Sequence, residues 1–167
     1  MVQDFVILFK RTTLDEIGFL DESLRRYEDW DWLIRYAKNH DIFIIEKPLL
    51  RHYPSMDSSP KTIEESALLF ISKHQKDFDS FGWYFRRRAL ARRWADIAIA
   101  YYQGHENKAQ TKKYFMRTIS TNPISNLEVY FGLFDIYFGT QLFNKALKAK
   151  DFLISILYKK QFQKLWN

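Results

Sequence analysis

The sequence predicts an α+β fold that is mostly helical, with a short strand-helix-strand segment over residues 1–58 and a bundle of helical hairpins over residues 59–167. Two short apolar runs near the N-terminus are typical of buried strands. After residue 59, apolar residues recur at helical spacing between breaks that contain glycine or proline. The charge changes as well: residues 1–60 carry 8 basic and 11 acidic side chains, net −3, whereas residues 61–167 carry 18 and 9, net +9.

The first part contains the two predicted strands and a short helical turn. Phe5-Val6-Ile7-Leu8-Phe9 is an uninterrupted apolar run, and Ile42-Phe43-Ile44-Ile45 is a second one. Runs of this length favour strands that are buried on both faces. Between them, Thr12 or Thr13 is suited to cap a helical turn that continues through Ile17, because a threonine hydroxyl accepts a hydrogen bond from a free backbone N–H.

The main helix of the first part is predicted over residues 28–39. It opens with Tyr27-Glu28-Asp29-Trp30-Asp31-Trp32-Leu33-Ile34-Arg35, which concentrates three carboxylates, two indoles and an arginine. Acidic residues favour a helix start because free N–H groups and the helix dipole make it positive. The expected apolar face consists of Trp30, Leu33, Ile34 and Ala37, with Glu28, Asp31 and Arg35 on other faces. Arg35 is expected to pair with Asp31 one turn away.

A polar, proline-flanked stretch over residues 54–60 separates the two parts. Ser59 is the predicted N-cap of the next helix, and Pro60 is its first residue. Five helices are then expected, at about 61–78, 84–103, 106–120, 126–138 and 141–158. The second and third are similar to one tetratricopeptide repeat, through Trp94, Ile97, Ala98, Tyr101, Gly104, Ala109, Tyr114, Phe115 and Pro123. Because about three repeats are needed for a stable solenoid, we expect one hairpin packed on its neighbours.

Residues 5–58 resemble the acceptor-side half of a family 2 glycosyltransferase, an inverting enzyme of GT-A type. The resemblance rests on the turn Gly18-Phe19-Leu20-Asp21-Glu22, the pair Glu28-Asp29 that opens a helix, and Arg35 on its next turns. The family commonly has Gly-Gly-Phe-Asp-Glu at the turn, so the second glycine and the aromatic residue are replaced here. The resemblance implies that the strand-helix-strand segment is a remnant of a GT-A (Rossmann-like) domain.

The resemblance also implies a reaction, in which a sugar passes from a nucleotide-sugar to a hydroxyl of a saccharide or lipid-linked acceptor. Asp29 would be the catalytic base that takes the proton from this hydroxyl. The acceptor-binding candidates are Asp21, Glu22, Glu28, Trp30, Asp31 and Arg35. Each has a plainer alternative: Glu28 and Asp29 stabilise a helix N-terminus in many proteins, and a tryptophan at helical spacing is often a core residue.

A divalent metal, Mg²⁺ or Mn²⁺, is implied for the complete enzyme, in which an Asp-x-Asp motif of the donor-binding half holds the donor diphosphate. His52 is the candidate metal ligand in this chain, although alignment of Pro54 with the family's proline places Tyr53 at the histidine position. His40, His74 and His105 lack the spacing of metal ligands and are expected at the surface.

The chain lacks a recognisable donor site. Asp29-Trp30-Asp31 belongs to the acceptor motif, and Asp77-Phe78-Asp79 falls in a predicted helix. The glycines form no phosphate-binding loop. We therefore expect the chain alone to hold neither metal nor nucleotide-sugar and to be inactive without the donor-binding half. The alternative function is a non-enzymatic, tetratricopeptide-like interaction module.

Composition restricts the remaining classes. The chain has no cysteine, which excludes disulfides and thiolate metal sites. It has no apolar run of the ~18–20 residues that a membrane span needs and no secretion signal after Met1, so we expect a cytoplasmic location, with the inner face of the membrane as an alternative. The basic helix around Arg86–Arg93 suits peripheral contact with a membrane or, alternatively, forms a solvated face. Nucleic acid is not expected, because no recognition motif accompanies this helix.

Overall fold

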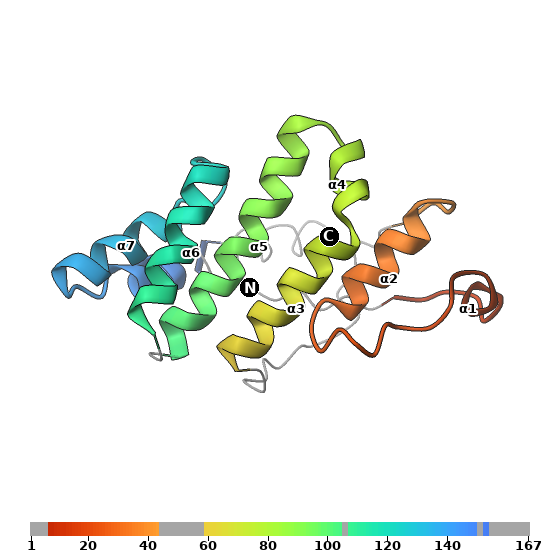
Figure 1. Ribbon diagram of the computed structural model, residues 1–167, viewed down its shortest axis with the longest axis horizontal. Coiled ribbons are helices and arrows are strands. Elements are labelled where there is room, and N and C mark those ends of the chain that lie inside the picture. Colours follow the sequence, from red (N-terminus) through yellow and green to blue (C-terminus); the bar gives the residue numbers. More distant parts are fainter. Residues whose placement is uncertain (1–6, 44–58, 105–106, 150–151, 154–167) are drawn as a thin grey trace, which may run out of the picture. The chain divides into compact units, whose positions relative to one another are not determined.

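A computed structural model describes residues 7–43, 59–104, 107–149 and 152–153 (Figure 1). These residues are mostly helical, as predicted. The helices are α1 (Thr12–Ile17), α2 (Glu28–Ala37), α3 (Pro60–Lys73), α4 (Gln75–Ser80), α5 (Trp83–Gly104), α6 (Lys108–Thr121) and α7 (Glu128–Phe138). Residues 142–149 are also helical. The chain divides into two compact units, Met1–Ser80 and Phe81–Asn167.

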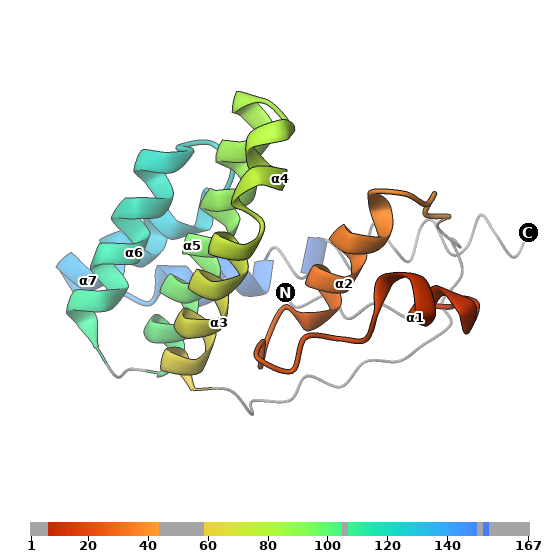
Figure 2. The same ribbon diagram turned by 45° about the vertical axis from the view of Figure 1, so that its right-hand side comes forward.

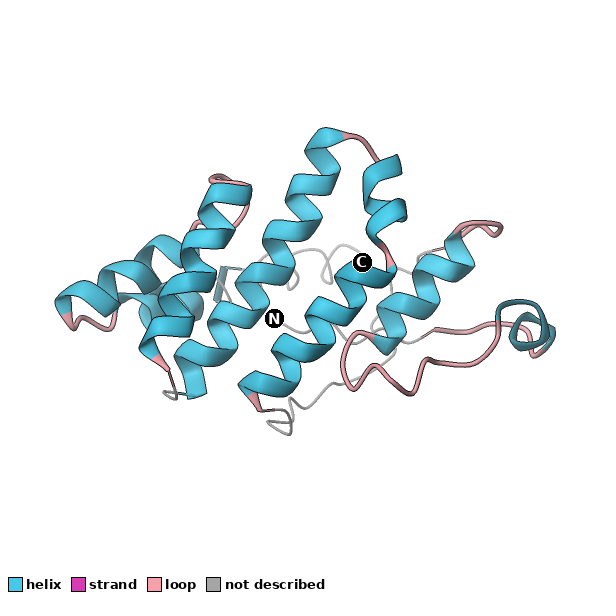
Figure 3. Ribbon diagram, viewed as in Figure 1, coloured by secondary structure: helices cyan, strands magenta, loops and turns pink. Residues whose placement is uncertain are grey.

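The predicted strands are not seen in the described part of the chain (Figure 3). Residues 7–9 and 42–43 are irregular, and the rest of both predicted strands lies outside the described residues. A strand requires a hydrogen-bonded neighbour, and residues 7–9 and 42–43 form no such pairing with other described residues. Instead, the ring of Phe9 packs on Trp32 with 4.7 Å between centroids. Leu8 and Phe43 are 79% and 88% exposed.

The first unit is built from α1 to α4, with α1 and the following loop beside α2 (Figure 2). Its buried apolar residues include Leu24, Trp32, Ala67, Phe70 and Phe78. The unit ends at Ser80, later than the boundary expected near residue 58, because α3 and α4 pack with the N-terminal segment. None of the helices that the structure describes is long and apolar enough to cross a membrane.

Local signals set the ends of several helices. The Ser59 hydroxyl accepts a hydrogen bond from the Thr62 N–H at 3.2 Å and Pro60 is the first residue of α3, both as predicted. The helix predicted over 61–78 is divided, because the backbone leaves helical geometry at His74. The predicted threonine cap of α1 is wrong: Arg11 occupies the N-cap position, and Thr12 already lies inside the helix.

In the second unit, α5 and α6 form the predicted antiparallel hairpin (Figure 1). Tyr114 of α6 stacks on Trp94 and Tyr101 of α5, with 6.2 Å and 6.4 Å between ring centroids. The facing surfaces are buried and apolar, and burial of such side chains contributes about 1.5–3 kcal/mol each. The hairpin is therefore the core of this unit.

Helix α7 packs on α6 and is joined to the helical residues 142–149 through Asp135. This carboxylate accepts hydrogen bonds from the hydroxyls of Tyr102 and Thr140 and from the N–H groups of Leu142 and Phe143. A carboxylate with four donors fixes the chain turn after α7. Beside it, a hollow of about 430 Å³ is lined by Tyr101, Tyr102, Lys108, Thr111, Thr140 and other residues.

Candidate functional site

The glycine turn of the first unit is fastened to α2 through its backbone. Gly18 has φ +83° and ψ 177°, a conformation that side chains with a Cβ rarely adopt. Its carbonyl accepts a hydrogen bond from the Trp32 indole N–H at 2.9 Å. The guanidinium of Arg35 donates to the carbonyls on either side, those of Ile17 and Phe19. The turn and the helix of the sequence motif therefore form one structural element.

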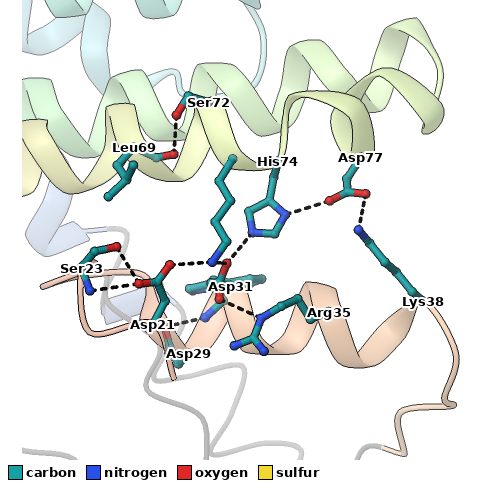
Figure 4. A network of polar contacts seen from close by, with 12 residues as sticks. Asp21, Ser23, Asp29, Asp31, Arg35, Lys38, Leu69, Ser72, His74 and Asp77 are labelled. Carbon is teal, nitrogen blue, oxygen red and sulfur yellow. Dashed lines mark hydrogen bonds and ion pairs between the residues drawn. The ribbon is translucent and has the colours of Figure 1, made fainter. Parts of the chain in front are cut away.

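Asp31 lies at the centre of this element and is fully buried (Figure 4). Its Oδ2 accepts from Arg35 Nε at 3.0 Å, which confirms the predicted pair one helical turn apart. Its Oδ1 lies 2.7 Å from Lys73 Nζ and 2.8 Å from His74 Nε2. Both partners belong to the end of α3, so this one carboxylate joins α2 to α3. The acceptor contact expected for Asp31 stays a prediction, and in this structure its carboxylate is bound by cationic side chains.

The predicted apolar face of α2 is wrong. Trp32 is only 2% exposed, whereas Trp30 is 38% exposed and Ala37 is exposed. The face that includes Asp31 and Trp32 turns inward instead. The Trp32 ring packs between Phe9 and Tyr36, and its N–H bonds to the glycine turn. The prediction from helical spacing missed this arrangement because it assumed that a charged residue such as Asp31 faces solvent.

Lys73 also binds Asp21, the acidic residue of the motif turn. Its Nζ lies 2.6 Å from Asp21 Oδ2, and Ser23 donates to Asp21 Oδ1 from both its N–H and its hydroxyl. This lysine thus bridges the turn carboxylate and the buried Asp31. The site is assembled from three places in the chain: the turn, α2 and the end of α3.

These contacts shift the acidities of the residues that make them. Burial raises the pKa of Asp31, but hydrogen bonds from Lys73, His74 and Arg35 outweigh burial and hold this pKa below its usual value. The hydrogen bond from Lys73 holds the pKa of Asp21 well below its usual range. Burial lowers the pKa of Lys73, but its bonds to both carboxylates raise it further than burial lowers it. All three groups are therefore charged at neutral pH.

His74 is buried, which corrects its predicted surface position. It is 2% exposed, with Nε2 at 2.8 Å from Asp31 Oδ1 and Nδ1 at 2.8 Å from Asp77 Oδ2. Asp77 in turn binds Lys38 at 2.7 Å. Burial raises the pKa of Asp77, and the bonds from Lys38 and His74 more than offset this and lower it. Both imidazole nitrogens donate to carboxylates only when the ring is doubly protonated.

The sequence did contain a signal that His74 is buried. Ala67, Phe70 and Ile71 are buried, and residue 74 continues their helical spacing. Lys73 carries no comparable signal, because lysines are common at helix ends. Of the other histidines, His40 is partly exposed and lies 3.2 Å from Glu16. His105 and the candidate metal ligand His52 lie outside the described residues.

Asp29 lies in the first turn of α2 and is partly exposed. Its Oδ1 accepts a hydrogen bond from the Trp30 N–H at 2.7 Å, and among the described residues it forms no ion pair. Tyr27, directly before the helix, has φ +69°, which is unusual for a residue other than glycine and costs of order 1–3 kcal/mol. Glu28 is partly exposed and Glu22 is exposed.

The described residues do not fit a divalent cation. Within those residues, no group of three or more His, Cys, Asp or Glu side chains has the geometry to hold one. The carboxylates that do cluster, Asp21, Asp31 and Asp77, are each bound to a cationic side chain. Asp77-Phe78-Asp79 lies in α4, as predicted, and not after a strand. A divalent metal would need ligands other than these carboxylates.

Comparison with known proteins adds no family assignment. No family model, curated protein or solved structure matches the chain.

Proposed function

We propose that the first unit is the acceptor-side part of a family 2 sugar transferase and that Asp29 is its general base. One observation carries this proposal. Of the motif's carboxylates, Asp21 and Asp31 are held by Lys73, whereas Asp29, like Glu22 and Glu28, is at least partly exposed and forms no ion pair with the described residues. Among these three, the family resemblance assigns the base to Asp29. A base must reach the proton that it removes, and a carboxylate bound to a lysine is a poor acceptor for another proton.

In the proposed reaction, Asp29 accepts the proton of an acceptor hydroxyl. As the proton leaves, the hydroxyl oxygen bonds to the anomeric carbon of the donor sugar, and the bond from that carbon to the nucleotide diphosphate breaks. The diphosphate leaves with the electron pair, and the configuration at the anomeric carbon inverts. General-base help of this kind is worth ~10²–10⁴ in rate.

The acceptor-binding candidates then fall into two groups. Glu22, Glu28 and Trp30 are exposed or partly exposed, and the indole of Trp30 offers a face on which a sugar ring packs. Asp21, Asp31 and Arg35 instead hold the glycine turn and α2 in place. We propose that the first group contacts the acceptor and that the second positions Asp29.

The proposal includes a nucleotide-sugar-binding half of GT-A type, which would supply the sheet that the two apolar segments join. Leu8 and Phe43, at the described ends of these segments, are 79% and 88% exposed and would be covered by it. That half would also provide the Mg²⁺ or Mn²⁺ site. The absence of cysteine supports a cytoplasmic location for the reaction.

Replacement of Asp29 by asparagine in the native protein that contains this chain is the decisive test. Asp29→Asn keeps the side-chain shape and removes the base, so we expect transfer from UDP- and GDP-sugars to fall ~10²–10⁴-fold. Thermal stability should fall only slightly, through the lost charge at the helix N-terminus. Asp15→Asn, at an exposed position of α1, is the matched control and should retain activity. Nucleoside diphosphate release measures both variants.

Retained transfer in Asp29→Asn would assign the base to another residue. A native protein that releases no diphosphate from any nucleotide-sugar would contradict the enzymatic proposal. The alternative, a tetratricopeptide-like interaction module, would then be favoured.

A further inference from the structure

The N-terminal end of α5 brings exposed aromatic rings and arginines together. Trp83, Tyr84 and Phe85 are 70%, 55% and 62% exposed. Residues 81–95 contain five arginines and no acidic residue. Farther along the helix, Arg92 and Arg93 pair with Asp96. The basic face expected over Arg86–Arg93 is therefore concentrated at the start of the helix.

Arg87 shows which other residues lie at this end of the second unit. Its guanidinium donates to the carbonyls of Ser120 and Thr121, the last residues of α6, and lies 4.9 Å from the centroid of the Trp83 ring. The segment that follows α6 is therefore near the start of α5. This segment, residues 122–127, has no charged residue, and its Ile124 and Leu127 are 79% and 60% exposed.

The resulting patch consists of Trp83, Tyr84, Phe85, Arg88, Ile124 and Leu127, and we call it the aromatic-arginine end. Each ring or aliphatic side chain in water costs free energy that burial would recover. Indole and phenol groups favour the headgroup region of a bilayer, where one edge is apolar and the other wet. Arginine binds phosphate through paired N–H donors.

We infer that the aromatic-arginine end docks the second unit onto the surface of an anionic membrane. Its apolar side chains enter the boundary between headgroups and acyl chains, and Arg88 binds a lipid phosphate. A single-stranded nucleic acid also stacks on aromatic rings, but Ile124 and Leu127 offer it no stacking face, whereas lipid chains accept them. The inference is independent of the proposed sugar transfer.

Binding of the full chain to vesicles tests this inference. Co-sedimentation with vesicles of phosphatidylcholine and phosphatidylglycerol should show binding that weakens with added salt and is much weaker on phosphatidylcholine alone. Trp83→Ser with Phe85→Ser should reduce affinity at least ten-fold, because it removes two inserted rings. Arg88→Glu should reduce it roughly ten-fold.

Matched controls distinguish docking through this patch from nonspecific effects of net charge and of exposed apolar surface. Lys61→Glu, a 79% exposed lysine side chain of the first unit, makes the same charge change as Arg88→Glu. Phe43→Ser removes a ring that is even more exposed than those of Trp83 and Phe85. Both should leave vesicle binding unchanged, and circular dichroism should show that all variants stay folded. Equal binding by wild type and the Trp83/Phe85 variant, or tighter binding to a single-stranded oligonucleotide than to anionic vesicles, would overturn the inference.

Discussion

Lys73 joins two acidic residues of the candidate site. Its ammonium group lies between the carboxylates of Asp21 and Asp31, and Asp31 is fully buried. A buried carboxylate that loses a partner keeps the full cost of its burial. The lysine thus holds a motif turn and a motif helix to α3, outside the region that the sequence motif covers.

Lys73→Met keeps most of the unbranched side chain and removes the charge. It should therefore destabilise the first unit by about 1–3 kcal/mol. The magnitude is reduced from that of a fully buried pair because the lysine side chain is 33% exposed. Urea unfolding measures the change. Lys61→Met is the control, since its pair with Glu65 is exposed on both sides and should matter by less than ~0.5 kcal/mol. Equal effects in both variants would contradict the bridging role.

Acid should weaken the first unit through Asp77. Its pKa is lowered in the folded state, so its contribution to stability is present above the unfolded value of about 3.9 and is lost as pH falls through the folded value. Asp77→Asn should therefore be less stable than wild type at about pH 6, and the difference should shrink toward about pH 2. Urea midpoints at several pH values measure this. A stability difference that is constant across this pH range would show that Asp77 stabilises the unit through packing or neutral hydrogen bonds and not through its charge.

At the scale of elements, local patterns predicted most helices and missed what depends on distant partners. The start of α3 at Ser59 and Pro60, and the extents of α5 and α7, follow from caps, breaks and periodicity within each segment. The division between α3 and α4 falls at His74, whose partner Asp31 is 43 residues away. No local pattern reports that contact. The same long-range contact explains why Asp31 is buried although its side chain is charged.

The packing of α7 on α6 depends on a close approach at Gly132. A Cβ at this position would lie 2.5 Å from the Phe115 ring and 3.2 Å from Phe143. Gly132→Ala should therefore destabilise the second unit by about 1–3 kcal/mol through overpacking, although alanine alone would favour the helix by ~1 kcal/mol.

A double-mutant cycle with Phe115→Leu identifies the cause of that loss. Leucine removes the ring edge that the new methyl group would meet, so the alanine substitution should cost less in this background. Thermal unfolding of the four proteins gives the coupling. An equal cost in both backgrounds would place the strain elsewhere than at Phe115.

At the scale of the whole molecule, the chain contains two compact units with separate cores, and their boundary lies between Ser80 and Phe81. The sequence placed this boundary at the polar, proline-flanked stretch before residue 59. Composition marks where a loop occurs, but a domain boundary depends on which helices share a core. Helix α3 shares the ion pairs of Lys73 and His74 with α2, which assigns it to the first unit.

Separate cores predict separate local stabilities. Lys73→Met should speed amide hydrogen exchange in α2 and α3 and leave α5 and α6 unchanged, whereas Gly132→Ala should do the reverse. The reason is that each substitution disturbs contacts inside one unit only. Mass spectrometry of peptides from the intact chain measures both patterns at once. If either substitution speeded exchange equally in both units, the chain would unfold as one cooperative body and the Lys73 bridge would support the helical hairpin as well as the proposed acceptor site.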